Sequence, residues 1–168
     1  AAVLRPDQAN RSAQELLQLE EAQAGVEAFE AERGVAFDLV VRARLDGFWS
    51  GPLPARARAP GVNTYVVPRA KQFGGLNDRL GLSSSAVARR VNRRASMLLR
   101  LRAAGSLRER ARTLNSEQLL NLTLAMHRIV PHRLPRLPFC LLVKRKCKCC
   151  LLVESCARSG NKLSLIHI

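Results

Sequence analysis

The chain changes its hydrophobic period abruptly at Gly34, from the spacing of a helix to the spacing of a strand. Apolar residues recur at three- and four-residue intervals over residues 16–29, after a capping-box pattern at residues 12–15, as in a helix with one buried face. After Gly34, apolar and other residues alternate over residues 35–43, the period of a strand. We therefore expect a helix that stops near Gly34 and a strand that ends close to Asp46.

Strands and helices continue to alternate through the rest of the sequence. The expected elements are a proline-containing loop at 51–61, a strand at 64–67, a helix capped by Ser83 or Ser84 that runs to Leu101, a helix capped by Asn115 with Gln118 at its third position, and a strand at 138–143. No internal repeat is present. This order predicts a domain of the α/β class.

The charge of the chain is uneven. Its 28 Lys and Arg against 13 Asp and Glu give a net charge of +15, with −4 in the first 48 residues and +19 in the other 120. Arg89 and Arg90 are followed four residues later by Arg93 and Arg94, a spacing that forms a stripe on a helix. A solvated helix face is the favoured interpretation and nucleic-acid contact the alternative. No run of 18 apolar residues occurs, so no membrane span is expected.

Four stretches of sequence carry a resemblance to a known class of proteins. They are FDLVVRARLDGFW at 37–49, YVVP at 65–68 leading into FGGLNDRLG at 73–81, LNSE at 114–117, and LPFC at 137–140. In this order and spacing they resemble segments of glycosyltransferase-like proteins from plants and algae. The resemblance covers about residues 20–145. It implies part of a nucleotide-sugar-transferase-like domain of the GT-A type, with a mixed, mostly parallel sheet flanked by helices.

The resemblance implies a nucleotide-sugar donor held near the end of the first strand. Asp46 stands at that position, where a carboxylate of such a domain holds Mg²⁺ or Mn²⁺ against the donor diphosphate. The usual motif has two acids flanking one residue, and Arg44 occupies the first acidic place. Arg44 could instead contact phosphate directly through its two-pronged guanidinium. A surface Arg–Asp pair that closes the strand is the equally weighted structural alternative.

A second group of donor-binding residues is expected in the glycine-containing loop. Gly74 and Gly75 would let the backbone approach a ligand, and Asn77 and Arg79 would bind hydroxyl or phosphate groups. The same residues also make an ordinary turn.

Glycosyl transfer with inversion needs one carboxylate to accept the proton of the attacking hydroxyl. Asp78 and Glu117 are the candidates. Glu117 lies in the first turn of an expected helix, where an acidic residue also stabilises the helix dipole.

The sequence changes character after about residue 145. Cys147, Cys149, Cys150 and Cys156 follow one another among lysines and apolar residues, without the paired Cys-x-x-Cys spacing of zinc knuckles. Palmitoylation is another interpretation. The final six residues are similar to a translated sequencing adapter. We therefore expect a partial glycosyltransferase-like domain at 1–145 and a disordered or artefactual tail at 146–168.

The leading functional hypothesis is a glycosyltransferase-like protein that transfers sugar from a nucleotide-sugar donor to an acceptor of unknown kind. Because the resemblance begins at a late strand of such a domain, we expect the earlier nucleotide-binding strands to lie upstream. We therefore expect this chain alone to be inactive. The alternatives are a basic nucleic-acid-binding module, which lacks interleaved aromatic residues, and a non-catalytic sugar- or nucleotide-binding protein of the same fold. The Golgi or secretory pathway and the cytoplasm both remain open as locations.

Overall fold

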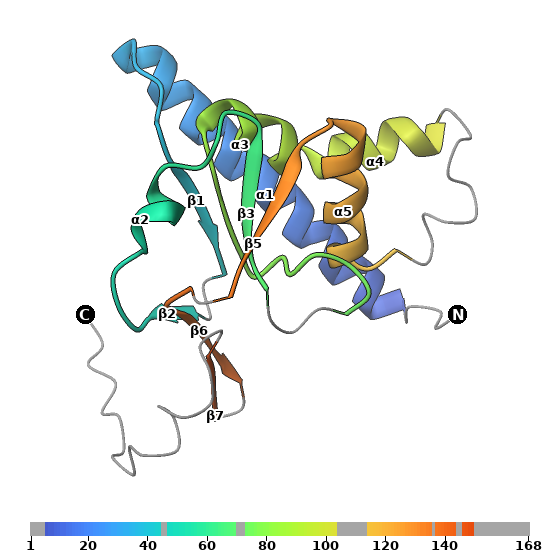
Figure 1. Ribbon diagram of the computed structural model, residues 1–168. Coiled ribbons are helices and arrows are strands. Elements are labelled where there is room, and N and C mark those ends of the chain that lie inside the picture. Colours follow the sequence, from blue (N-terminus) through green and yellow to red (C-terminus); the bar gives the residue numbers. More distant parts are fainter. Residues whose placement is uncertain are drawn as a thin grey trace.

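A mixed four-stranded sheet lies at the centre of the molecule (Figure 1). The computed structural model describes residues 6–44, 47–69, 73–103, 114–135, 137–143 and 146–149. The strands of the sheet, in spatial order, are β1 (Val40–Ala43), β4 (Leu80–Ser83), β3 (Thr64–Pro68) and β5 (Val130–Leu134). The α/β class expected from the alternating periods is confirmed.

The directions of the strands correct one expectation. β4 is antiparallel to both of its neighbours, β1 and β3, and only β3 and β5 are parallel. The expectation of a mostly parallel sheet is therefore wrong, because β4 turns back along β3 and separates it from β1. The parallel pair β3–β5 is joined through helices, as parallel strands require.

Helices α3 (Ser85–Asn92) and α5 (Ser116–Met126) cover one face of this sheet. The core on that face consists of Tyr65, Val67, Leu76, Val87, Val91, Leu120, Leu124 and Ile129. The short helix α2 (Ala55–Arg58) covers the opposite face. The core there consists of Ala57, Val66, Leu80, Leu82, Leu134, Leu137 and Phe139. The sheet is thus buried on both sides, as in other α/β layers.

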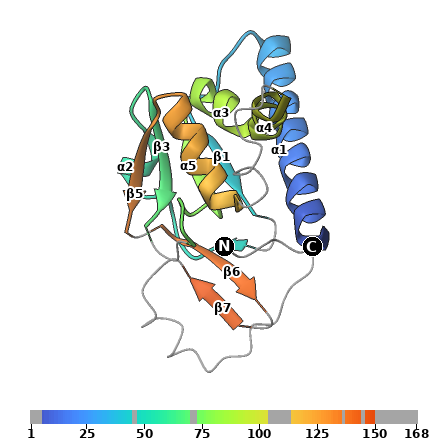
Figure 2. The same cartoon turned by 90° about the vertical axis from the view of Figure 1, so that its right-hand side faces the viewer.

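Helices α1 (Pro6–Arg33) and α4 (Arg94–Ala103) pack outside α3 (Figure 2). Polar contacts join them: the buried Asn92 amide donates to Gln23 Oε1 at 2.9 Å, and Glu20 accepts from the Ser96 amide and hydroxyl of α4 at 2.6 and 2.7 Å. α1 already includes residues 6–15, so the capping box predicted at residues 12–15 does not start it.

The helix expected to run from Ser84 to Leu101 is divided in two. α3 ends at Asn92 and α4 begins at Arg94. Ser84 stands at the N-cap of α3 but makes no capping hydrogen bond through its side chain. The break at Arg93 leaves this residue exposed and turns Arg94 into the interior. Of the helices among the described residues, none is both long and apolar enough to cross a membrane.

A second, antiparallel sheet lies beyond the end of the first (Figure 1). It consists of β2 (Gly47–Trp49), β6 (Phe139–Val143) and β7 (Lys146–Cys149), in this order. The ring of Phe139 is buried in the core under α2 and meets Trp49 edge-on, with ring centroids 5.3 Å apart. Residues 146–149, which we expected in a disordered or artefactual tail, form the strand β7. Residues 150–168 lie outside the described part of the chain.

Candidate functional site

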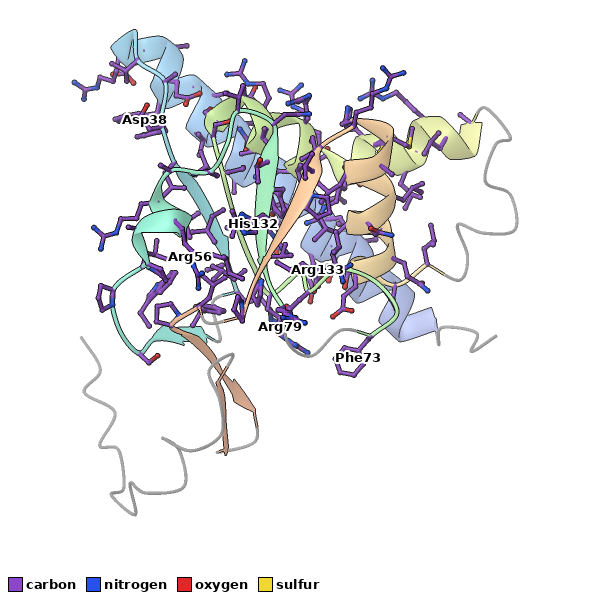
Figure 3. All side chains as sticks on the ribbon, in the orientation of Figure 1. Asp38, Arg56, Phe73, Arg79, His132 and Arg133 are labelled. Atoms are coloured by element: carbon purple, nitrogen blue, oxygen red, sulfur yellow. The ribbon has the colours of Figure 1, made fainter. Side chains whose placement is uncertain are left out.

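Three strands of the central sheet end at the same edge, and the expected site residues gather there. β1, β3 and β5 run in one direction, so their carboxyl ends share this edge with the start of β4. Phe73 and Arg79, in the loop that leads into β4, lie at this edge (Figure 3). The carboxyl ends of strands are where open α/β sheets bind their ligands.

The loop at residues 73–76 is fixed to the first turn of α5. The Asn115 side chain accepts a hydrogen bond from the Gln118 amide at 2.8 Å, and its own amide group donates to the Phe73 carbonyl at 2.7 Å. The reciprocal bond from the Asn115 amide to Gln118 Oε1 completes the predicted capping box. A Cβ atom on Gly75 would lie 2.2 Å from the Glu117 carbonyl carbon, so only glycine fits this contact.

The Glu117 carboxylate belongs to the same loop attachment. It accepts hydrogen bonds from the main-chain amides of Phe73 and Gly75, and its residue is only 4% exposed. Burial raises the pKa of this carboxyl, and the nearby Asp78 carboxylate adds to the rise, while the Phe73 amide and Arg79 oppose it. These contacts give Glu117 a clear structural task; its role as a catalytic base stays a prediction.

Asn77 and Arg79 shape the turn before β4. The buried Asn77 side chain accepts from the Arg79 amide at 3.1 Å, which is the Asx-turn geometry typical of asparagine. The Arg79 guanidinium lies over the Phe73 ring, 5.4 Å from its centroid. Gly74 adopts a φ of 86°, a conformation that favours glycine. The expected loop residues are therefore close together, and each has a defined part in the turn.

Two of the expected residues, Arg44 and Asp78, line one pocket. It has a volume of about 530 Å³ and lies between α1 and the end of β1. Helix α1 contributes Glu15, Gln18, Leu19 and Ala22 to its lining. The rest of the lining consists of Arg42 and Ala43 of β1, Arg44 directly after β1, and Asp78. Arg42 donates to the Asp78 carbonyl oxygen, and the Arg44 amide donates to the Arg79 carbonyl at 3.2 Å. Main-chain and side-chain bonds thus join the end of β1 to the loop.

A buried cation interacts electrostatically with two residues of this pocket. Arg94, the first residue of α4, is fully buried and interacts electrostatically with Arg42, Asp78 and Tyr65. Burial, followed by the neighbouring Arg42 charge, lowers its pKa to about 10. The sequence stripe placed Arg94 on an exposed face, and that interpretation is wrong. Neither Arg94 nor Arg42 was selected from the sequence, because the burial of an arginine leaves no local sequence signal.

A second pocket, of about 450 Å³, lies among α3, α4 and the end of α5. We call it the arginine groove; its lining consists of Arg89, Arg90, Arg93, Met97, Arg100, Leu101, Met126 and His127. Arg93 forms an ion pair with Glu27 at 2.6 Å, and Arg90 bonds Asn63 at 3.0 Å. Its charges are solvated and partly paired, as expected of a surface helix face.

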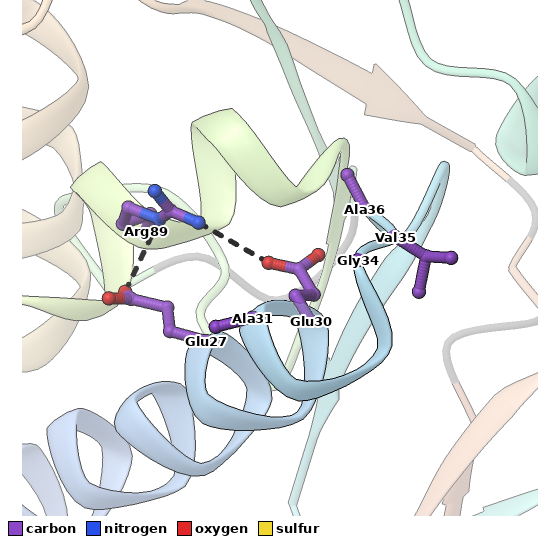
Figure 4. Close-up of a pocket in the computed structure, with 7 residues that line it drawn as sticks. All are labelled: Glu27, Glu30, Ala31, Gly34, Val35, Ala36 and Arg89. Carbon is purple, nitrogen blue, oxygen red and sulfur yellow. Dashed lines mark hydrogen bonds and ion pairs between the residues drawn. The ribbon is translucent and has the colours of Figure 1, made fainter.

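A shallow pocket at the end of α1 is built around an ion-pair network (Figure 4). Arg89 reaches Glu27 at 3.5 Å and Glu30 at 3.3 Å. The Ser85 hydroxyl, the Phe37 amide and Arg89 face the Glu30 carboxylate and hold its pKa below its ordinary value of 4.5. These contacts join α1 to α3 and to the residues before β1. Their role is therefore structural.

The described residues do not form a divalent-metal site at the sheet edge. No cluster of three or more His, Cys, Asp or Glu suited to a metal occurs among them. Asp78 lies next to Arg42 and Arg94, whose positive charges disfavour a bound cation. Asp46, the expected metal ligand, lies outside the residues that the structure describes.

Comparison with other proteins gives a family and no activity. No curated protein and no solved structure shows a significant match. The model of one protein family matches residues 1–151, and its description is a domain of unknown function, DUF7796. Because this match spans most of the 168 residues, the chain belongs to the DUF7796 family.

Proposed function

We propose that the chain binds the diphosphate of a nucleotide-sugar donor, as part of a glycosyltransferase-like domain of the GT-A type. The observation that carries the proposal is the pocket at the end of β1, where Arg42 and Arg44 line the wall together with Asp78. Guanidinium groups suit phosphate oxygens because they donate two parallel hydrogen bonds. The pocket also lies where α/β sheets bind nucleotides.

The proposed reaction is transfer of the sugar to an acceptor hydroxyl with inversion. The hydroxyl oxygen attacks the anomeric carbon, the bond from that carbon to the diphosphate oxygen breaks, and Asp78 accepts the hydroxyl proton. Arg42 and Arg44 stabilise the negative charge that develops on the leaving diphosphate. Asp78 suits the base better than Glu117, because the Glu117 carboxylate already accepts two main-chain hydrogen bonds. No step is assigned to a metal ion, since the described side chains do not fit one.

Calorimetric titration with nucleoside diphosphate sugars, nucleoside diphosphates and nucleoside monophosphates tests the donor proposal. We expect the diphosphates to bind more tightly than the monophosphates, and Arg44→Met to weaken binding about tenfold, the loss of one charge-assisted hydrogen bond. Arg100→Met, which changes the arginine groove only, is the matched control. Equal affinity of the wild type and Arg44→Met would contradict the proposal.

The arginine groove supports a second candidate, a nucleic-acid-binding module. Four arginines and His127 line it, and such a surface attracts phosphate backbones without sequence preference. Titration of single-stranded RNA at increasing salt concentration tests this function, with Arg100→Met as the probe and Arg44→Met as the control. Steep loss of affinity with salt, reduced by Arg100→Met alone, is the expected result. Absence of binding at physiological salt would eliminate the candidate.

A further inference from the structure

Arg94 carries a buried charge that no hydrogen bond among the described residues satisfies. Its Nε, Nη1 and Nη2 atoms are all buried, and none has a hydrogen-bond partner among the residues that the structure describes. The hydroxyl of Tyr65, one of its neighbours, is likewise buried without a partner. A buried ion with no hydrogen bonds is strongly disfavoured, so proteins normally supply a partner.

Tyr65 and Arg42, two of the groups that interact electrostatically with Arg94, lie on one face of the sheet. Tyr65 crosses β4 at Gly81, where a Cβ atom would lie 1.9 Å from the tyrosine hydroxyl oxygen, so the strand must carry glycine there. Gly81 is paired with Arg42 of β1, so Arg42 lies on the same face of the sheet as Tyr65. Glu20 covers the start of α4 by accepting two hydrogen bonds from Ser96.

The buried charge interacts electrostatically with the pocket at the end of β1. Two of the groups with which Arg94 interacts electrostatically, Arg42 and Asp78, line that pocket. Together with Arg44, the pocket and its wall hold three guanidinium groups against the carboxylates of Glu15 and Asp78. In a dry interior the attraction of Arg94 for an anion is weakened much less than it would be in water.

We propose that the wall on which Arg42 lies is a subsite for one phosphate group of the ligand, with Arg94 as the buried positioning charge. This inference rests on the proposed function and specifies where the phosphate lies. The phosphate contacts Arg42 at the pocket surface, and the Arg94 charge attracts it. The bound anion then adds a second negative charge to that of Asp78 near Arg94.

Substitution of Arg94 should raise the stability of the free protein and weaken phosphate binding at the same time. Arg94→Met keeps a long unbranched side chain and removes the charge, so we expect a higher melting temperature without ligand. We also expect at least a tenfold loss of affinity for inorganic pyrophosphate, used as the probe. Arg94→Lys, which keeps a positive charge, should retain most of the affinity. Arg56→Met, at an exposed arginine of α2 that lines neither pocket, should leave the affinity unchanged.

Affinity is measured by calorimetry on the full chain, together with the shift in melting temperature that pyrophosphate produces. Pyrophosphate binding equal in the wild type and Arg94→Met would overturn the inference. If Arg94→Met does not fold, Arg94→Gln, which keeps polar atoms and loses the charge, takes its place with the same expectation.

Nucleotide sugars tested in parallel separate the two proposals. Arg94-dependent binding of pyrophosphate without binding of any nucleotide sugar would support the subsite and contradict the donor function. Tight nucleotide-sugar binding that is unchanged in Arg94→Met would support the donor function and contradict the subsite. If neither probe binds the wild type, both proposals are wrong.

Discussion

Arg93 and Arg94 are neighbours in the chain and have opposite surroundings. The Arg93 side chain is 51% exposed and forms an ion pair with Glu27 at 2.6 Å. Arg94 is fully buried, and its guanidinium has no hydrogen-bond partner among the described residues. Water and counter-ions screen the first charge but not the second. One step along the chain therefore separates a charge of little energetic consequence from one that demands a partner.

The same difference separates the arginine groove from the pocket at the end of β1. Groove arginines bond to surface groups, among them Glu27 and Asn63, and keep much of their contact with water. The pocket has fewer arginines, but the fully buried Arg94 interacts electrostatically with two of its lining residues. The net charge of +19 in the last 120 residues thus points less directly to a ligand than one buried arginine does.

Replacement of the buried arginine should give the largest effect on stability. We expect Arg94→Met to raise the free energy of unfolding by about 1–4 kcal/mol, because an apolar side chain replaces a buried ion. Urea denaturation measures the change, and Arg93→Met is the control, with a change below about 1 kcal/mol. Destabilisation by Arg94→Met would mean that the guanidinium already makes stabilising contacts, and the contrast between the two arginines would fail.

The loop beside the buried charge gives the next largest effect. Gly75→Ala would place a Cβ atom 2.2 Å from the main chain of Glu117, and we expect a loss of about 1–3 kcal/mol in unfolding free energy. Gly25→Ala is the matched control in α1, where the added atom meets nothing within 4 Å. There alanine should stabilise the protein by up to about 1 kcal/mol, since it favours a helix. Equal effects of the two substitutions would show that loop 73–76 does not pack tightly against α5.

Two carboxylates repeat the contrast between a desolvated and a paired charge. The raised pKa of Glu117 means that its contribution to stability is present below the ordinary value of 4.5 and is lost as the pH rises through the folded-state pKa. The lowered pKa of Glu30 has the opposite sign: its contribution is present above 4.5 and is lost as the pH falls through the folded-state pKa.

Unfolding free energies of the wild type, Glu117→Gln and Glu30→Gln, measured from about pH 3 to pH 8, test both signs. Relative to the wild type, Glu117→Gln should become more stable as the pH rises. Glu30→Gln should be least stable relative to the wild type near neutral pH, and the difference should shrink in acid. Parallel pH profiles for all three proteins would contradict both pKa assignments.

The sequence predicted the parts of the fold that depend on local pattern. The helix over residues 16–29, the strand β3 and the capping box at Asn115 follow from periodicity and cap chemistry, and all are present. β4 and β5 were missed. β4 is only four residues long and contains Gly81, a residue type that is depleted in strands, and the first four residues of β5 are exposed. Their places are determined by pairing with distant strands, which a local pattern does not record.

The sequence named several residues near the end of β1, but it did not predict how they are arranged. Arg44 and Asp78 line one pocket, and Glu117, in the first turn of α5, accepts a hydrogen bond from Phe73 in the loop before β4. That these residues act together in catalysis stays a prediction. Arg42, Tyr65 and Arg94 were missed because their contact is made by the sheet register and by the break between α3 and α4. Burial of a charge is a property of the whole fold.

The smallest expected effect concerns the ion pair of Arg93 with Glu27. Arg93→Ala should lower the unfolding free energy by less than about 1 kcal/mol, because the pair is exposed and the gain from pairing is offset by ordering two long side chains. A double-mutant cycle with Glu27→Ala measures the coupling, which should shrink as salt screens the charges. Arg89 also reaches Glu27 at 3.5 Å, so part of the Glu27 effect should persist in Arg93→Ala. A coupling energy that is large and independent of salt would mean that Arg93, like Arg94, is a desolvated charge. The arginine groove and the pocket at the end of β1 would then differ only in that Arg94 has no hydrogen-bond partner among the described residues.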